Sequence, residues 1–358
     1  MKAAVISMGS VSSKWLAEAL TKHFEIVDQV DVRKIEIRLS QKKIDVVYKG
    51  EPLGEYDCIY AKGSYKYAPV LRALTKAYCK ETYLPIKASA FTTGHDKLLT
   101  HLKLQQFKIP QPQTYLAATT RAAKNILKTI TYPVVMKLPA GTQGRGVMFA
   151  DSYASASSML DALDTLKQPF IIQEYIETGG VDIRAIVVGD KVAASMKRHA
   201  VMGEKRANIH AGAKGESVEL DEQTKKIAIE TAQALDAEIC AVDILESPKG
   251  PLVIEINLSP GLQGITEATK TNVAEKLAAF LFKKAKEMHD KKKEKGTSKI
   301  MQELSGEAKE LITNVDFRGN RILLPEIITK VTRFRLNEDL VMKIEKGKLV
   351  IEKFVDKD

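Results

Sequence analysis

The 358-residue sequence contains only three cysteines and no apolar run long enough to span a bilayer. Cys58, Cys79 and Cys240 are far apart, and their spacing fits neither a disulfide framework nor a metal site. Thiols of this kind are typical of a reducing compartment. The first nine residues look like a short strand rather than a signal peptide. The sequence therefore predicts a cytoplasmic protein that does not act in a membrane.

Several catalytic patterns are also missing. The sequence contains no HExxH or CxxC motif and no Ser/His/Asp arrangement, which argues against a zinc peptidase, a dithiol oxidoreductase and a serine hydrolase. No covalent nucleophile is evident. Most of the scattered histidines are expected to be ordinary residues: His23, His95, His101, His199, His210 and His289.

The composition, with 44% hydrophobic and 28% charged residues, is that of a globular protein. The length predicts two or three domains, each able to bury its own core. The net charge of +10 raises the hypothesis of a nucleic-acid or acidic partner. Charge alone decides little, because many cytoplasmic enzymes are basic.

The first 90 residues alternate strand and helix patterns, which predicts an α/β unit with a parallel sheet. Strands are expected at Ala3–Met8, Ile44–Tyr48 and Cys58–Ala61, and helices at Ser13–His23 and Pro69–Cys79. An amphipathic helix is expected over residues 94–107, with Leu98, Leu102 and Leu104 on its buried side. The prolines of KIPQPQTY end it, and strands and helices alternate again from Tyr115 to Phe282.

Residues 283–299 contain eight lysines against three acidic residues, which predicts a solvated helix end running into a linker. A strand-rich pattern follows in residues 311–355. The expected divisions are residues 1–90, 91–282, a linker at 283–305 and a last domain at 306–358.

The stretch KLPAGTQGRGVMF, residues 137–149, places three glycines between two strand-like runs. It predicts a hairpin with a long glycine-rich connection. Gly141, Gly144 and Gly146 would let several backbone N–H groups approach one anion, although a floppy surface loop is the alternative. Lys137 would place an ammonium group beside this phosphate cradle, and Lys97 is either a second cation or an exposed helical lysine.

The stretch AVDILESPKGPLVIEINLSPG, residues 241–261, predicts two strands joined by a Ser-Pro-Lys-Gly turn. Glu255 and Asn257 share one face of the second strand, and antiparallel pairing brings Asp243 opposite Val253 or Glu255 on that face. Two carboxylates and an amide oxygen suit Mg²⁺. The alternative is a polar strand edge that faces solvent.

Further polar residues lie between the glycine loop and the acidic strands. The strand-end backbone at residues 173–176 could recognise a purine edge. Asp182 and Arg184 share a face, and Arg198 returns on the partner strand of a hairpin turned at residues 189–190. Arg206 and Asn208 follow. Each alone fits an ordinary surface charge, but together they indicate a polyanionic ligand.

Taken in order, the segments KLPAGTQGRGV, QEYIE, DIRAIVVGDKV, KRH, RANIH, AVDIL and EINLSPG resemble the ATP-grasp fold. More narrowly, they resemble the RimK-type ligases, which add glutamate to a carboxylate of a protein or small molecule. The resemblance is close over about residues 90–280 and looser over 1–90, as the pre-ATP-grasp domain. It implies an α/β and α+β fold class.

The resemblance also implies site residues. ATP contacts are implied for Lys97, Lys137, Glu174, Tyr175, Asp182, Arg206 and Asn208, together with the glycines of the loop. Asp243, Glu255 and Asn257 become ligands of Mg²⁺ or Mn²⁺, with two ions expected. Arg198 becomes the candidate that stabilises the acyl phosphate and oxyanion, and Arg206 is assigned to catalysis with it.

The predicted function is an ATP-dependent carboxylate–amine ligase that works through an acyl phosphate and adds glutamate or a related amino acid. The alternative is a nucleic-acid-binding regulator whose ATP-grasp part only senses nucleotide. A pure sensor has no need of both metal carboxylates, Asp243 and Glu255, so their presence favours the enzyme.

The C-terminal stretch 311–354 resembles the AbrB/SpoVT/MazE swapped-hairpin domain, which forms a barrel only as a dimer and often binds DNA. This resemblance implies a homodimer or a multiple of one. Four arginines could meet nucleic-acid phosphates: Arg318, Arg321, Arg333 and Arg335. The alternative is a domain that only dimerises.

Overall fold

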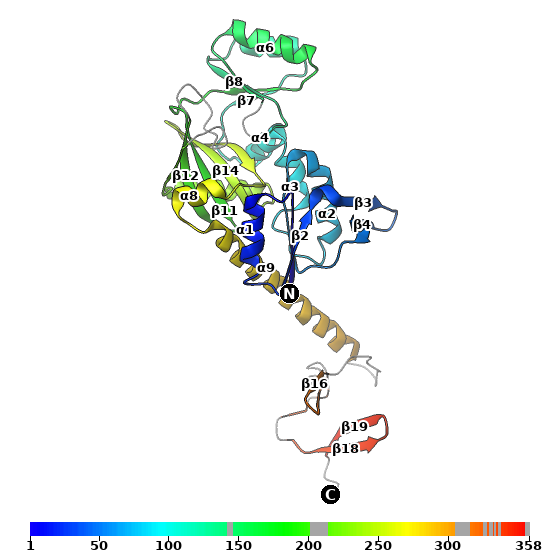
Figure 1. The fold of residues 1–358 in the computed structure, drawn as a ribbon. Helices are drawn as coiled ribbons and strands as arrows, with labels where there is room; N and C mark the ends of the chain where they lie inside the picture. The colour runs from blue at the N-terminus through cyan, green and yellow to red at the C-terminus, as the bar shows by residue number, and fades with distance from the viewer. Residues whose placement is uncertain are drawn as a thin grey trace. The chain divides into compact units, whose positions relative to one another are not determined.

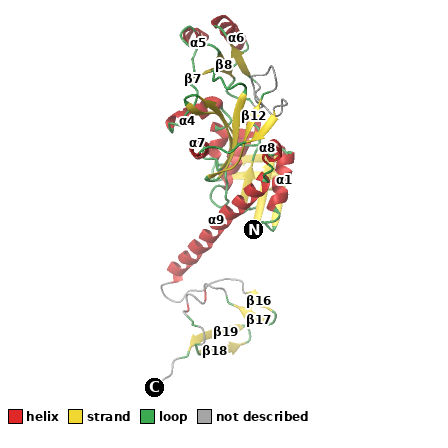
Figure 2. Cartoon of the chain, turned by 90° about the vertical axis from the view of Figure 1, so that its left-hand side faces the viewer, coloured by secondary structure: helices red, strands yellow, loops and turns green. Residues whose placement is uncertain are grey.

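A computed structural model describes residues 1–141, 146–200, 214–304, 316–324, 328, 332, 334–335 and 338–354, with the side chains of 293–304 and 316–317 left out. The chain forms two compact units, Met1–Lys286 and Glu287–Asp358. Figure 1 labels the elements, and Figure 2 separates helices from strands. In the described residues, no helix is long and apolar enough to cross a membrane.

The first unit begins with a parallel sheet in the order β2-β1-β6. Its strands are β1 (Lys2–Ser7), β2 (Ile26–Asp31) and β6 (Cys58–Ala61), and the helix α1 (Val11–Leu20) connects β1 to β2. Residues Ala3 to Ile6 of β1 are almost completely buried, as an apolar central strand requires. The expected parallel sheet is confirmed.

The strand at Ile44–Tyr48 does not join that parallel sheet, which corrects the arrangement implied by the alternation. This strand, β4, forms a separate antiparallel sheet with β3 (Ile35–Leu39) and β5 (Glu51–Pro52). The connection from β3 to β4 is too short for a parallel crossover, so only an antiparallel hairpin is possible. Short helices complete this region: η1 (Val32–Lys34), η2 (Tyr65–Tyr67), α2 (Ala68–Tyr78) and α3 (Ala88–Thr93).

Helix α4 (Lys97–Gln106) begins three residues later than expected, because the Asp96 side chain caps it by accepting a hydrogen bond from the Leu99 N–H. Its buried residues are Thr100, His101 and Leu104. Leu102 is 56% exposed, so its predicted burial is wrong. Positions 100, 101 and 104 follow the helical repeat, whereas residue 102 lies on another side.

A second sheet carries the glycine-rich hairpin, in the order β7-β10-β8-β9. Its strands are β7 (Thr114–Tyr115), β8 (Val134–Lys137), β9 (Val147–Ala150) and β10 (Ile171–Glu174). Two helices, α5 (Thr120–Leu127) and α6 (Tyr153–Thr165), share a core with this sheet around Met136 and Leu160. The predicted β8–β9 hairpin is confirmed.

The third sheet is antiparallel throughout, in the order β13-β12-β11-β14-β15. Its strands are β11 (Val181–Val188), β12 (Lys191–His199), β13 (Lys214–Ser217), β14 (Ile239–Ser247) and β15 (Gly250–Asn257). The hairpins predicted at residues 189–190 and at the Ser-Pro-Lys-Gly turn are both present. Helices α7 (Glu222–Ala234) and α8 (Gln263–Thr269) contact this sheet.

Helix α9 (Val273–Leu304) is 32 residues long and continues through the Lys-rich segment, so residues 283–304 are helical. In the second unit, β16 (Asp316–Arg318) pairs with β17 (Arg321–Leu323), and β18 (Leu340–Glu345) pairs with β19 (Lys348–Lys353). These hairpins leave several apolar side chains exposed: Ile322, Leu323, Met342, Ile344, Leu349 and Phe354.

Candidate active site

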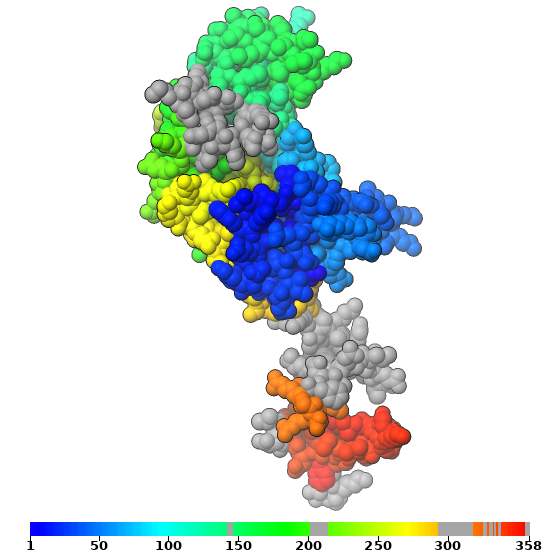
Figure 3. All heavy atoms as spheres, viewed as in Figure 1, coloured from blue at the N-terminus to red at the C-terminus, as the bar shows by residue number. Residues whose placement is uncertain are grey.

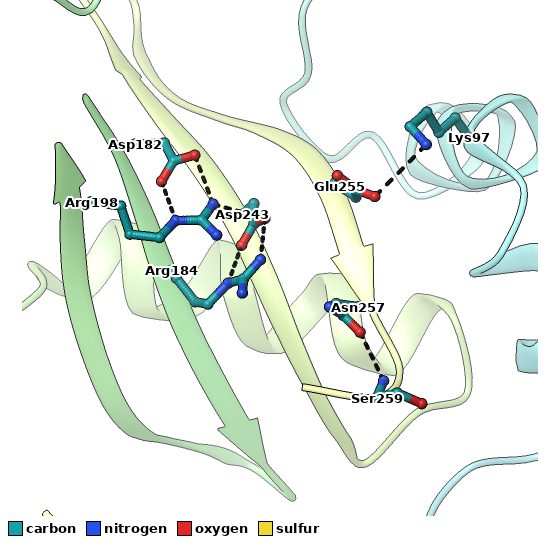
Figure 4. A network of polar contacts seen from close by, with 8 residues as sticks. All are labelled: Lys97, Asp182, Arg184, Arg198, Asp243, Glu255, Asn257 and Ser259. Atoms are coloured by element: carbon teal, nitrogen blue, oxygen red, sulfur yellow. Dashed lines mark hydrogen bonds and ion pairs between the residues drawn. The ribbon is translucent and has the colours of Figure 1, made fainter. Parts of the chain in front are cut away.

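The two acidic strands pair as the sequence predicts. Asp243 of β14 lies opposite Glu255 of β15, and Ala241 lies opposite Asn257. A β-bulge follows Asp243, so the register shifts between it and Ile244. Asp243 therefore lies in the middle of β14 opposite Glu255, and Asn257 lies at the end of β15 (Figure 4).

Two arginines and two aspartates form a buried network across β12, β11 and β14 (Figure 4). Arg198 donates to both oxygens of Asp182, from Nε at 2.6 Å and Nη2 at 2.7 Å. Its Nη2 also lies 2.9 Å from Oδ2 of Asp243. Arg184 donates to Asp243 through Nε at 2.8 Å and Nη2 at 2.7 Å. The cross-strand register sets these pairs: Asp182 faces Arg198, and Arg184 faces Asp243.

Burial and charge act in opposite directions on these carboxyl groups. Burial would raise the pKa of Asp243, but the guanidinium groups of Arg184 and Arg198 outweigh it and hold that pKa at about 2. Burial raises the pKa of Asp182, and Arg198 offsets this only in part. Asp243 is thus a stable carboxylate at neutral pH although it is almost fully buried.

Lys97 connects the acidic strands to the glycine loop. Its Nζ lies 3.8 Å from Oε1 of Glu255 and donates to the carbonyl oxygen of Gly141 at 3.3 Å. Its backbone N–H donates to the carbonyl of Pro139 at 3.0 Å. The side chain is only 11% exposed, which excludes the alternative of an exposed helical lysine.

Lys137 is held by a chain of buried hydrogen bonds. Its Nζ donates to Oε1 of Gln173 at 2.5 Å, which leaves the Gln173 amide nitrogen as a donor. That nitrogen contacts Thr114 Oγ1 at 2.8 Å and His101 Nε2 at 3.0 Å. His101 Nε2 must then accept, so Nδ1 carries the proton and donates to Gln111 Oε1 at 2.6 Å. Each bond fixes the direction of the next.

The electrostatics agree with this assignment. Burial lowers the pKa of His101 to about 4, and the neighbouring Lys137 adds to the shift, so the imidazole is neutral at physiological pH. Burial lowers the pKa of Lys137 to about 8, against a smaller opposing effect of Glu255. The ammonium of Lys137 is therefore charged at neutral pH but close to its titration.

Sequence reasoning predicted only Lys137 among these residues and missed the other members, Gln173, Thr114, His101 and Gln111. His101 was predicted to be an ordinary residue, and the side chain of Gln173 had no role. Two signals were available: His101 follows Lys97 by four residues, which puts both on one helix face, and Gln173 is a polar residue in the apolar strand β10. The face shared by Asp182 and Arg184 and the return of Arg198 on the partner strand were predicted, but the pairing of Arg184 with Asp243 was not.

The other predicted nucleotide contacts lie at the end of β10, beside β8 and β9, or outside the described residues. The backbone N–H of Glu174 donates to Gln113, and Glu174 Oε2 accepts from the Gln113 N–H at 3.2 Å. Tyr175 packs edge-on against Phe149, with ring centroids 5.9 Å apart. Gly146 has a left-handed φ of 77°, and its carbonyl accepts from the Leu138 N–H at 2.9 Å. Gly144, Arg206 and Asn208 lie outside the described residues.

The oxygen donors suit a hard divalent cation. A carboxylate has about four lone-pair positions, and three N–H groups contact Asp243, so Oδ1 keeps a position. Asn257 Oδ1 accepts one bond, from the Ser259 N–H at 2.9 Å, and the side chain of Glu255 is 41% exposed. Oxygen atoms of this kind are the ligands that Mg²⁺ prefers. Within the described ranges, no three His, Cys, Asp or Glu side chains form a metal cluster.

The comparisons with known proteins decide the family. The model of the RimK-like ATP-grasp domain matches residues 94–281. "Probable alpha-L-glutamate ligase 2" of Pseudoalteromonas atlantica is 37% identical over 301 residues, which are 83% of this chain and 100% of that protein. "Probable alpha-L-glutamate ligase" of Vibrio cholerae is 35% identical over the same shares. The chain belongs to the RimK-like ATP-grasp family. As a member of it, the chain is an ATP-dependent ligase.

Solved structures support the ATP-grasp fold. A RimK domain ATP-grasp protein from Sphaerobacter thermophilus has a TM-score of 0.62 at 21% identity, covering 78% of this chain and 99% of that one. The ATP-grasp ligase PsnB, solved with a minimal precursor, Mg and ADP, has a TM-score of 0.63 at 15% identity, covering 80% of this chain and 98% of that one. The predicted mixed α/β architecture with an ATP-grasp domain is confirmed.

Proposed function

We propose that this RimK-like protein is a carboxylate–amine ligase that adds glutamate, or a related amino acid, to a carboxylate of a protein or small-molecule acceptor. The observation that carries the proposal is the charge arrangement of the site. Four cations (Lys97, Lys137, Arg184 and Arg198) gather near three carboxylates (Asp182, Asp243 and Glu255). The excess positive charge suits a polyphosphate, and the exposed part of Glu255 suits its accompanying metal.

The reaction has two balanced steps. An acceptor carboxylate oxygen attacks the γ-phosphorus of ATP, which forms an acyl phosphate and releases ADP. The amino group of the incoming amino acid then attacks the acyl carbon, the C–O bond to phosphate breaks, the nitrogen loses a proton, and an amide and inorganic phosphate result. Neither step uses a covalent protein intermediate, so positioning and charge neutralisation are the protein's main contributions.

The position of each residue suggests its proposed role in binding ATP or the reacting groups. Lys137 and Lys97 are proposed to bind the phosphates. Lys137 is oriented by Gln173, so its remaining N–H groups have fixed directions. Arg198 is the candidate for stabilising negative charge at the reacting acyl group, and Arg206 is proposed to assist it. Glu174 and Tyr175 stand at the strand end proposed to hold the adenine.

Asp243, Glu255 and Asn257 would hold Mg²⁺ or Mn²⁺, with two ions proposed. When bound, the metal would neutralise the phosphate oxygens and act as a Lewis acid. The chain's own part is to keep these oxygens in place: Arg184 and Arg198 fix Asp243, and the Ser259 N–H fixes the Asn257 side chain. Lys97 holds Glu255 at the edge of the glycine loop.

For the second unit, the proposal is an AbrB-like module that makes a homodimer and offers a basic surface to a nucleic acid or acidic protein. Two facts support it. Apolar side chains of its hairpins are exposed, and Arg318 and Arg321 face each other across a two-residue turn. Arg333 lies outside the described residues. The separate idea that the whole protein is only a nucleotide-sensing regulator has no support from the relatives, which are named as ligases.

The test is mass spectrometry of a cell extract after incubation with the protein, Mg-ATP and isotopically labelled glutamate. We expect labelled products that carry an added glutamyl residue, with ADP formed in parallel. The Glu255→Gln variant is the matched control. ADP formation that needs neither an amine nor an acceptor, without any labelled product, would contradict the ligase proposal.

A further inference from the structure

The proposed chemistry has not used the carboxyl ends of the strands in the parallel sheet of the first unit. In the order β2-β1-β6, the chain leaves β1 toward β2 on one side, while β6 adds on the other side. In open α/β sheets, ligands bind outside the carboxyl ends of the strands where the order reverses in this way. Here that place lies between Ser7, which ends β1, and Lys62, which follows β6.

Lys62 is unusual because it is buried without a carboxylate. Its residue is 7% exposed, and its backbone N–H donates to the Ile6 carbonyl at 2.8 Å, which fixes it beside β1. Its Nζ donates to the Pro260 carbonyl at 3.1 Å. No ion pair joins Lys62 to a carboxylate in the described part of the chain. A buried ammonium with one neutral acceptor is costly, because its lost hydration is only partly replaced.

A second buried polar group supports this view. Tyr60 is in β6 and Lys62 directly follows that strand, with its N–H still bonded to β1, so the extended backbone directs both side chains to the same side. Its phenolic oxygen is buried and has no hydrogen-bond partner among the described residues. Two under-satisfied polar groups on one face indicate that the protein alone does not complete their bonding.

The surroundings link Lys62 to the end of the acidic strand β15. Ser259 Oγ accepts from the Gly63 N–H at 2.7 Å and donates to the Gly63 carbonyl at 2.9 Å. The Ser259 N–H in turn donates to Asn257 at 2.9 Å. The Leu262 N–H also donates to Ser12 of helix α1 at 2.8 Å. Figure 3 shows the segments in contact, with the blue N-terminal part against the yellow part around α8.

We infer that Lys62 binds a carboxylate group of a substrate, between the ends of β1 and β6 and beside the loop that follows β15. A carboxylate is favoured over a phosphate because one ammonium balances one negative charge, whereas the polyphosphate cations gather at the glycine loop. The inference rests on the proposed ligase function, which supplies two sources: a carboxylate of the incoming amino acid or a non-reacting carboxylate of the acceptor.

The first experiment needs no turnover. Thermal unfolding of the full chain is measured with and without Mg-ADP, while L-glutamate or N-acetyl-L-glutamate is added. L-Glutamate represents the amino acid, and N-acetyl-L-glutamate represents an acceptor because it has carboxylates but no nucleophilic amine. The variants are Lys62→Met, which removes the charge, and Lys62→Arg, which keeps it. Lys66→Met is the matched control, since Lys66 is an exposed lysine of the same segment.

We expect at least one of the two compounds to raise the melting temperature of the wild type and of the Lys66→Met and Lys62→Arg variants, but not of Lys62→Met. The responding compound identifies the source of the carboxylate. Without any carboxylate, Lys62→Met should melt at or above the wild-type temperature, because a costly buried charge is gone. If Lys62 serves only to hydrogen-bond the Pro260 carbonyl, Lys62→Met should melt below the wild type, and all variants should respond equally to the added carboxylates. That result would overturn the inference.

The second experiment measures steady-state constants with the labelled-glutamate assay. Lys62→Met should raise the KM of the carboxylate substrate about ten- to a hundredfold, the range of a lost charge-assisted hydrogen bond, with the KM for ATP within about twofold of wild type. Equal changes in both constants would contradict a carboxylate site. If the wild type forms no product at all, the ligase proposal fails, while the thermal experiment still decides whether Lys62 binds a carboxylate.

Discussion

The guanidinium of Arg184 forms two hydrogen bonds with the carboxylate of Asp243, at 2.8 and 2.7 Å, between neighbouring strands of the five-stranded sheet. Asp243 is almost completely buried, so this pair replaces the hydration that its charge lost on folding. The same pair keeps a candidate metal ligand ionised and fixed in direction. Arg184 therefore belongs to the architecture of the site.

Removal of this partner should destabilise the fold. Arg184→Met is expected to lower the free energy of unfolding by about 2–3 kcal/mol, less than the full penalty of an isolated buried charge because Arg198 still contacts Asp243. Urea denaturation measures the change. Lys197→Met is the control: Lys197 pairs at 2.7 Å with the exposed Glu246, and its loss should cost at most about 1 kcal/mol. Equal losses in the two variants would refute the argument.

Glu255→Gln should abolish turnover and leave the fold intact. The change keeps the size of the side chain and removes one negative charge from the candidate metal site, so Mg²⁺ should bind more weakly. We expect ADP formation to fall about a hundredfold or more, and chelation of the metal should stop the wild type. Glu246→Gln, an exposed carboxylate on β14, is the control and should be active. Near-normal ADP formation by Glu255→Gln at ordinary Mg²⁺ concentrations would rule out the metal assignment.

The buried hydrogen bonds that join Lys137 to Gln173 and Gln173 to His101 should affect nucleotide binding. Gln173→Leu and His101→Leu remove bonds that orient the ammonium, and each should raise the dissociation constant of Mg-ADP about tenfold, which corresponds to about 1.4 kcal/mol. His101→Gln keeps an acceptor for the Gln173 amide and should recover part of the loss. Calorimetric titration with Mg-ADP measures these constants. Equal affinities of His101→Leu and His101→Gln would show that the ring only fills space.

Nucleotide binding should weaken as the pH rises through about 8. Burial lowers the pKa of Lys137 to about 8, so its ammonium is charged below that pH and becomes neutral above it. Because the charged form attracts phosphate, the affinity for Mg-ADP is highest on the acidic side of this pKa. Lys137→Met should bind weakly without this dependence. Burial also lowers the pKa of Lys62 to about 8. Because Lys62 lies at the end of β6 and not beside the proposed phosphate site, the Lys62→Met variant should keep the pH dependence of Mg-ADP binding. A wild-type affinity that is constant from pH 7 to about 9 would contradict the prediction.

The second unit should set the oligomeric state. Its described hairpins expose apolar side chains that a second copy could cover, and so few residues make a small core on their own. Truncation after Lys286 should turn a dimer into a monomer and preserve ADP formation with a small acceptor, because Met1–Lys286 is a compact unit. Light scattering measures the mass in solution. The same number of chains per particle before and after truncation would contradict the dimer.

The full chain should also bind a nucleic acid with an affinity that falls as the salt concentration rises, and salt-insensitive or absent binding would contradict the nucleic-acid part of the basic-surface proposal.

Local pattern was enough to predict the hairpins that carry the site. The period of two in a strand puts Glu255 and Asn257 on one face, and the short turn before them forces antiparallel pairing with the strand of Asp243. The glycine-rich hairpin and the parallel N-terminal sheet followed from similar reasoning. The hairpins depend on a turn whose length permits one pairing, and the parallel sheet was indicated by the alternation of strands and helices along the chain.

Only the tertiary structure decided which polar groups meet. Lys97 reaches Glu255, Gln173 joins Lys137 to His101, and Lys62 sits against Pro260, although these partners are 36 to 198 residues apart in sequence. Leu102 is exposed for a related reason, because the rest of the molecule determines which face of helix α4 is covered. A sequence pattern states which side chains share a face. The packing of distant strands determines what that face contacts. Burial removes the water around each charged group, and the packing decides whether a partner in the protein replaces that water.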